Sequence, residues 1–377
     1  MKIKPQRMKI STHTHTGTNT TRTRLAALAA SVVLAVSPAV HAATMHTSIV
    51  TANNTNVVLD SGDTISVTST DTATALDAVA VNTHSNSTID MGTGSTVNAM
   101  GRGLRAYGTN SVITADKITV TVGTEAEPST MAFSGVYAQA GAQISLGSGS
   151  VINLHGVNTG QEHRGIFAYE DNSVVTADSG LVLRVTSIGD INNGASADRG
   201  GTLHLGTGAN IEAERALQAS NKGTITATGG QFRGVGENGY GIQVTGGTLT
   251  LTGSEVWGEK YGINVASTSA GEHTTGNVTI SGGTVSSGSD TVIKGANPAA
   301  ANPTDVTVTF TDGAQAASAA GDNGYLYQAD AGVSAEASVS VVIDGADTTV
   351  AGRFLTEARR KSSTEAETAH TNSTPPP

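Results

Sequence analysis

Residues 102–116 read RGLRAYGTNSVITAD, and residues 164–178 read RGIFAYEDNSVVTAD. The second copy begins 62 residues after the first, and ten of the fifteen positions are identical. A looser copy, SGVYAQAGAQI, lies between them at residues 134–144. A duplication with a third copy near its midpoint indicates a repeated structural unit of about half that length.

A short motif recurs beyond the duplication: a small residue, an apolar residue, any residue, and then alanine or valine. The apolar residues of this motif are Leu104, Val136, Ile166, Leu217, Ile242 and Ile263. The gaps between them are 32, 30, 51, 25 and 21 residues, so we interpret the gap of 51 as two units. A period that drifts between about 20 and 30 residues is typical of a solenoid with loops of variable length.

Alternating apolar and polar residues indicate that the unit is built from strands. Residues 118–122 read ITVTV, residues 249–252 read LTLT, and residues 306–310 read VTVTF. Such alternation places one apolar row on one face of a strand. Leucine-rich repeats are excluded because the leucine ladder with asparagine is missing. We therefore predict an all-β fold, a right-handed single-stranded parallel β-helix over residues 43–357, with roughly a dozen coils stacked at ~4.8 Å.

The composition agrees with such a fold and excludes several functions. The 377 residues include only 3% aromatic and 14% charged residues, and the net charge is −10. An acidic chain has no overall attraction for nucleic acid, so we expect no nucleic-acid partner. The chain has no cysteine, which excludes disulfides and thiolate metal sites. We expect no cofactor and no bound metal.

The first 42 residues have the features of a signal peptide. Residues 1–24 contain six basic residues and no acidic residue, and residues 25–36 form an apolar run. Pro38 follows this run. Val40-His41-Ala42 comes next and has small residues at the two positions that a signal peptidase recognises. We predict cleavage between Ala42 and Ala43, and export. A retained anchor is the alternative, but an apolar run of 12 residues is short for a bilayer core of ~30 Å.

Four segments in the C-terminal half of the predicted solenoid share a strand-and-turn pattern: 277–285 (NVTISGGTV), 306–314 (VTVTFTDGA), 324–327 (GYLY) and 340–347 (SVVIDGAD). With these as the closest stretches, the chain resembles the passenger domain of pertactin-like autotransporters of Gram-negative bacteria. In that family such segments are successive coils of a β-helix, and the resemblance extends over roughly residues 45–357. It implies a surface-directed protein that acts in adhesion or virulence, at the cell surface or outer membrane.

Two departures from the family limit what the resemblance implies. Family members continue into a β-barrel translocator, whereas residues 358–377 are charged, unpatterned and end in three prolines. We predict a disordered tail there, a truncated or frameshifted gene, and a periplasmic location for the chain as given. The second departure is the absence of Arg-Gly-Asp, so an integrin-binding role is not carried over.

Six residues are candidates for surface contact. Arg102, Arg164, Tyr107 and Tyr169 occupy equivalent positions of the duplication, so each pair is expected two coils apart on one face. Trp257 and Tyr261 are candidates for a sugar-stacking patch, and the alternative is that they cap a loop or fill the core. The expected partner is a host-cell or matrix protein or a glycan. We expect a monomer with no transmembrane segment in the mature chain.

We find no pattern that predicts catalysis. The polar cluster of Glu162, His163 and Arg164 with residues 169–172 is interpreted as a turn between coils. The histidines have no ligand spacing, and the serine-hydrolase motif Gly-x-Ser-x-Gly is absent. We therefore predict a non-catalytic adhesin. The alternatives are a carbohydrate-active β-helix enzyme, a polysaccharide lyase or hydrolase, and a non-functional remnant of a longer adhesin.

Overall fold

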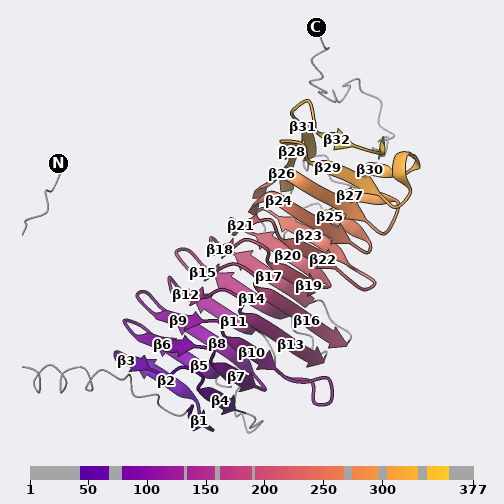
Figure 1. The fold of residues 1–377 in the computed structure, drawn as a ribbon. Helices are drawn as coiled ribbons and strands as arrows, with labels where there is room; N and C mark the ends of the chain where they lie inside the picture. Colours follow the sequence, from indigo (N-terminus) through magenta and orange to yellow (C-terminus); the bar gives the residue numbers. More distant parts are fainter. Residues whose placement is uncertain are drawn as a thin grey trace, which may run out of the picture. The chain divides into compact units, whose positions relative to one another are not determined.

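The computed structural model shows a stack of parallel strands in the part of the chain that begins at Ala43 (Figure 1). It describes residues 43–67, 79–130, 134–157, 162–188, 192–266, 274–295, 304–329 and 338–355. These residues form strands β1 to β33 and one 3-10 turn, η1 (Gly321–Asn323). The predicted signal peptide (1–42) and the predicted tail (358–377) lie outside the described residues.

One sheet, called sheet B here, has 12 strands whose order follows the chain. Its strands are β2 (Val50–Asn53), β5 (Val79–His84), β8 (Arg102–Tyr107), β11 (Ser134–Gln139), β14 (His163–Tyr169), β17 (Asn192–Asp198), β20 (Arg215–Ser220), β23 (Tyr240–Thr245), β25 (Tyr261–Val265), β27 (Thr291–Gly295), β30 (Tyr325–Ala329) and β33 (Arg353–Leu355). Successive strands pair in parallel, for example β11 with β14 and β14 with β17. Each strand marks one coil, so the 12 strands agree with the predicted dozen.

The second sheet, sheet A, has 21 strands in two ladders. Ladder A1 follows sheet B in each coil and contains β3 (Asn56–Val58), β6 (Thr88–Thr93), β9 (Val112–Asp116), β12 (Gln143–Leu146), β15 (Val174–Ala177), β18 (Thr202–Leu205), β21 (Thr224–Thr228), β28 (Thr304–Thr311) and β31 (Ser338–Ile343). Ladder A2 closes the coil and contains β1 (Met45–His46), β4 (Thr64–Val67), β7 (Thr96–Ala99), β10 (Thr119–Val122), β13 (Val151–Val157), β16 (Val182–Ile188), β19 (Asn210–Ala213), β22 (Gln231–Gly234), β29 (Gln315–Ser318) and β32 (Thr349–Val350).

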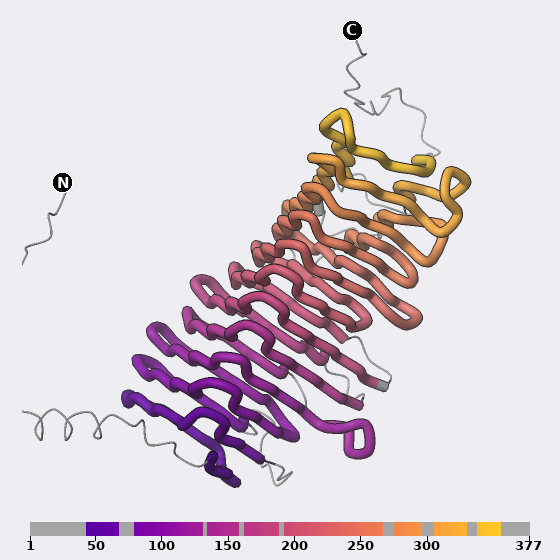
Figure 2. The backbone as a smooth tube through the Cα atoms, viewed as in Figure 1, coloured from indigo at the N-terminus to yellow at the C-terminus, as the bar shows by residue number. Residues whose placement is uncertain are grey.

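The two ladders join in two long strands, β24 (Thr248–Gly258) and β26 (Thr274–Ser287). The first half of each strand extends ladder A1 and the second half extends ladder A2. Gly253 and Gly282 have positive φ angles of 57° and 66° where the halves meet, a backbone conformation that glycine adopts at little cost. The coil path is visible in the backbone tube (Figure 2). These features confirm the predicted parallel β-helix.

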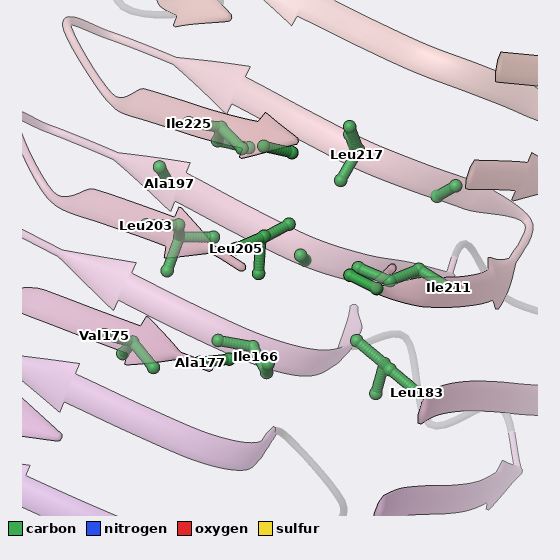
Figure 3. Close-up of a cluster of buried hydrophobic side chains, with 14 of the residues drawn as sticks. Ile166, Val175, Ala177, Leu183, Ala197, Leu203, Leu205, Ile211, Leu217 and Ile225 are labelled. Atoms are coloured by element: carbon green, nitrogen blue, oxygen red, sulfur yellow. The ribbon is translucent and has the colours of Figure 1, made fainter. Parts of the chain in front are cut away.

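The core forms because alternate strand residues point into the coil. In β10, Val120 and Val122 are fully buried, whereas Thr119 and Thr121 stay partly exposed. Figure 3 shows Ile166, Val175 and Leu183 as part of this apolar interior, with equivalent residues of the next coils beside them. Small aliphatic residues dominate, although Phe232 and Phe310 are also fully buried. The core therefore runs from coil to coil along the stack.

Steric crowding explains why the recurring motif has glycine at positions 103 and 165. A Cβ atom at Gly103 would lie 2.4 Å from Val120 Cγ1 and 2.5 Å from the carbonyl oxygen of Gly135. A Cβ at Gly165 would lie 2.4 Å from Leu183 Cδ1. These positions face the interior at the corner where ladder A2 turns into sheet B, so the chain can pass only without a side chain.

The strand register confirms that the two copies of the duplication are equivalent segments of different coils. Ala106 pairs with Ala138, and Ala138 pairs with Ala168, so the two copies lie two coils apart. The gap of 51 residues is two units, because Ala195 lies between Ile166 and Leu217 in the register. A search for a large apolar residue at this position misses the intervening unit, because the residue there is alanine.

Candidate functional site: the outer face of sheet B

The outer face of sheet B is formed by three rows of side chains that point away from the core. In each strand, the residue of the middle row lies between two buried residues, such as Leu104 and Ala106 in β8. The middle row contains Arg105, Tyr137, Phe167, Ser196, Gln218, Gln243 and Asn264. The back row contains Tyr107, Gln139, Tyr169, Asp198, Ser220 and Thr245. The front row precedes the inward glycines and contains Arg102, Ser134, Arg164, Asn193, Arg215, Tyr240 and Tyr261.

Aromatic rings stack along this face because the register places them on neighbouring coils. The rings of Tyr137 and Phe167 are stacked, with centroids 5.2 Å apart and an interplanar angle of 6°. Phe167 also contacts Tyr169, at 5.3 Å between centroids. Further along the stack, Tyr240 and Tyr261 are stacked at 5.6 Å. Offset and stacked pairs of this kind add to stability beyond the area that they bury.

Arginine side chains lie over these rings. The guanidinium carbon of Arg164 is 4.4 Å from the ring centroid of Phe167, and that of Arg102 is 5.2 Å from Tyr137. Arg105 lies over Tyr107 at 5.1 Å, and Arg199 lies over Tyr169 at 5.2 Å. Such cation–π contacts attract each guanidinium group to the face of its ring and restrict its position.

Glu162 connects three coils at the edge of the front row. Its carboxylate accepts a hydrogen bond from Arg164, lies 3.9 Å from Arg215 Nη1, and lies 3.4 Å from Asn193 Nδ2, which donates to it. The side chain of Glu162 is 37% exposed, whereas that of Arg215 is 12% exposed. The prediction that this polar cluster is a turn is wrong for His163 and Arg164, which belong to strand β14, and His163 is fully buried. Glu162 precedes β14 and adds one carboxylate beside the front row.

Burial shifts the pKa of several groups on this face. Burial lowers the pKa of Arg102, and the neighbouring charges of Arg105 and Arg164 lower it further. Burial also lowers the pKa of Arg215, while Glu162 acts in the opposite direction. Burial raises the pKa of Tyr137 to about 12, although Arg102 and Arg105 oppose the shift. The face therefore holds positive charge in surroundings that water reaches only in part.

Five of the six predicted contact residues lie on this face. Tyr107 and Tyr169 share the back row two coils apart, as predicted, with Gln139 between them. Arg102, Arg164 and Tyr261 belong to the front row. Trp257 lies elsewhere, in the ladder A2 half of β24, where Arg233 lies over its ring at 5.0 Å. The structure thus places Trp257 and Tyr261 on different sheets.

Sequence reasoning missed the most closely stacked pair, Tyr137 and Phe167. Both residues are 7% exposed although they face outward. The signal was present in the repeat alignment, where these two aromatic residues occupy the position of Arg105, between two inward residues. An aromatic residue at an outward position of two successive coils indicates a stack on the outside of the sheet.

The described residues also bear on metal binding, membrane insertion and signal cleavage. Within the described ranges, no group of three or more histidine and acidic side chains is placed to hold a metal ion. No helix among the described residues is both long and apolar enough to cross a membrane. Of the predicted cleavage pair, Ala43 is the first described residue and Ala42 lies outside the described part.

Comparison of the chain with protein-family models, with curated proteins and with solved structures gives no match.

Proposed function

We propose that this protein is an exported β-helix passenger that acts in adhesion or host interaction, and that it does so by binding rather than by catalysis. The observation that carries the proposal is the back row of the outer face of sheet B, where Tyr107 and Tyr169 lie two coils apart with Arg105 and Arg199 over their rings. Tyrosine and arginine are the residues that contribute most to binding at protein interfaces. Tyr107 is 37% exposed and provides an accessible edge of this face.

Export and surface direction form the second part of the proposal. They are supported by the basic, apolar and small-residue pattern of residues 1–42 and by the resemblance to pertactin-like passengers. A stacked solenoid suits this role because each added coil enlarges the surface while contacting only its neighbours. The partner is expected to be a glycan or protein of a host cell or its matrix.

Adhesion can be measured with beads coated with the purified full chain. We expect the beads to bind cultured epithelial cells, and Tyr107→Ala combined with Tyr169→Ala to reduce binding several-fold. The matched control is Thr114→Ala, an exposed residue of β9 in ladder A1, which should leave binding unchanged. Equal binding by the tyrosine and threonine variants would exclude the outer face of sheet B as the contact surface.

The same preparation separates adhesion from the enzymatic alternative. Incubation with a panel of plant and bacterial polysaccharides should release no reducing ends or unsaturated sugars. Sustained product formation that grows with protein concentration would replace the adhesin proposal by a carbohydrate-active enzyme.

A further inference from the structure

Trp257 lies on the outer face of ladder A2, within two rows of side chains that point away from the core. These rows alternate along each strand with fully buried residues such as Phe232 and Val256. Together they form what we call the Trp257 surface. The register aligns Asn210, Gln231, Glu255, Thr284 and Gln315 in one row, and Glu212, Arg233, Trp257, Ser286 and Ala317 in the other.

The Trp257 surface is accessible to solvent. Gln231, Arg233, Glu255 and Gln315 are exposed, and Trp257 is half-buried. Gln231 Nε2 donates a hydrogen bond to Glu255 Oε2 over 3.1 Å, and the guanidinium carbon of Arg233 is 5.0 Å from the ring centroid of Trp257. Because that hydrogen bond occupies one oxygen of Glu255 and one N–H of Gln231, each side chain keeps a further polar atom for a ligand.

Small residues follow Trp257 along its row. Ser286 and Ala317 occupy the same position on the next two coils. Gly288 lies in the turn after β26, and a Cβ atom there would be 3.3 Å from Trp257 Cζ2. The row therefore has no bulky side chain beyond Trp257 for two coils. An indole with low neighbours on one side offers an apolar surface beside polar groups, which is where an amphipathic ligand can pack.

The composition of the Trp257 surface matches a neutral carbohydrate. A sugar presents C–H groups that pack on an aromatic ring and hydroxyls that bond to planar polar side chains. Glu212 and Glu255 outnumber the one cation, Arg233, so the ten residues carry a net charge of −1 and disfavour an acidic ligand. A protein partner would be expected to meet a larger apolar centre, whereas Trp257 is the single large apolar side chain of the ten.

We propose that the Trp257 surface binds a neutral, extended, β-linked oligosaccharide laid along the stack of coils. One sugar of such a chain advances about as far as one coil, ~4.8 Å, so successive sugars meet successive polar residues while one sugar stacks on Trp257. Ladder A2 is separate from sheet B. The inference therefore adds a second binding surface to the proposed adhesive face and does not depend on it.

Fluorescence provides the first test, because Trp257 is the only tryptophan of the chain. The purified full chain is titrated with cellohexaose, with chitohexaose and with a hyaluronan hexasaccharide, which is acidic. We expect a neutral β-linked oligomer to change the emission in a saturable way and to reduce quenching by acrylamide at least twofold, because a stacked sugar shields the indole. The acidic oligomer should bind at least tenfold more weakly. Unchanged emission and quenching with both neutral oligomers would overturn the inference, and tighter binding of hyaluronan would overturn the neutral ligand class.

Variants measured by isothermal titration give the residue-level test. Trp257→Ala should weaken binding of the neutral oligomer at least tenfold, and Trp257→Phe should restore part of it, since a smaller ring still stacks. Glu255→Ala should weaken binding several-fold because it removes a hydrogen-bond acceptor. The matched control is Tyr325→Ala, a half-buried ring of β30 in sheet B that lies 4.9 Å from the guanidinium carbon of Arg353 and should have no effect. Equal affinity of Trp257→Ala and Tyr325→Ala would exclude this surface, and far-ultraviolet circular dichroism verifies that each variant keeps its β structure.

The bead assay separates this inference from the proposed function. Beads that adhere to cells when coated with Trp257→Ala, a variant that no longer binds the oligosaccharide, would support two independent surfaces. If neither neutral oligomer binds while the beads adhere, the carbohydrate inference is wrong and adhesion stands. If the combined Tyr107→Ala and Tyr169→Ala variant loses the oligosaccharide while Trp257→Ala retains it, the sugar binds on sheet B and the assignment to Trp257 is wrong.

Discussion

The ring of Phe167 lies parallel to the ring of Tyr137 on the neighbouring coil, with an interplanar angle of 6° and 5.2 Å between centroids. Both side chains face away from the core, yet each is only 7% exposed. Arg164 and Arg102 lie over the two rings. Sheet B therefore carries a packed layer on its outside as well as on its inside, and this layer holds the residues to which we assign binding.

The first prediction concerns the strength of this stack. Phe167→Ala should lower the free energy of unfolding by about 3 kcal/mol, since it removes a largely buried ring. Combined with Tyr137→Ala, the two changes should couple by about 1 kcal/mol, which is typical of aromatic pairs. Urea denaturation of the two single variants and the double variant measures the coupling. Strict additivity would mean that the rings do not support each other.

The second prediction concerns alkaline pH. Burial raises the pKa of Tyr137 from its ordinary value of 10.0 to about 12. A raised pKa means that the unfolded chain loses this proton first, so the stability due to the neutral phenol is complete below pH 10 and declines as the pH rises toward 12. Tyr137→Phe should reduce the loss of stability between these values. Urea midpoints at pH 9, 10 and 11 measure it, and an unchanged slope would contradict the assignment.

The third prediction concerns the first coils. The carboxylate of Asp63 accepts hydrogen bonds from the amides of Thr44 (2.7 Å) and Asp60 (3.1 Å), and it lies 3.1 Å from His46 Nε2. Burial alone would raise the pKa of Asp63, but these hydrogen bonds outweigh it and lower the pKa below 3.8. A lowered pKa means that the contribution to stability is complete above this ordinary value and is lost as the pH falls through the folded value.

Hydrogen exchange can measure the effect of Asp63 locally. Asp63→Asn should speed exchange of the Thr44 and Asp60 amides at neutral pH, with little change at coils far from it. In the unmodified protein, the protection of the same amides, measured as the ratio of intrinsic to observed exchange rate, should fall as the pH drops through the folded pKa of Asp63. Equal protection of Thr44 in both proteins would show that the carboxylate does not hold this segment.

The fourth prediction concerns the corner glycines. Gly165→Ala would place a Cβ 2.4 Å from Leu183 Cδ1 and 2.8 Å from the carbonyl oxygen of Gly194, so we expect a loss of about 2 kcal/mol in stability. The matched position is Ala216, which occupies the same corner one coil beyond Gly194. There the local path already accommodates a methyl group, and Ala216→Gly should cost about 1 kcal/mol. Thermal unfolding of both variants provides the comparison.

The fifth prediction concerns processing. Val40-His41-Ala42 follows the apolar run, so the exported product should begin at Ala43. N-terminal sequencing of protein recovered from the cell envelope tests this. A product that retains residues 1–42 in the envelope would support the retained anchor.

Much of the fold could be predicted from the sequence because its signals are local. Alternation such as ITVTV at residues 118–122 requires an inward and an outward face, whatever the rest of the chain does. The duplication alone predicts that Tyr107 and Tyr169 share one row, and the register confirms it. Trp257 could not be assigned in this way, because the two-residue turn 259–260 between β24 and β25 carries the chain to another sheet before Tyr261.

The sequence by itself determined the strand period, the parallel stacking and the approximate number of coils, since these follow from residue alternation and repeat spacing. Only the tertiary structure decided which outward side chains meet. The loops between coils differ in length, so the contacts of Glu162 with Arg164 and Arg215, and of Tyr137 with Phe167, arise only when the stacked register aligns their strands. The alternation of arginine with small polar residues in the front row is a product of that register, because its residues come from five successive coils separated by unequal stretches of chain.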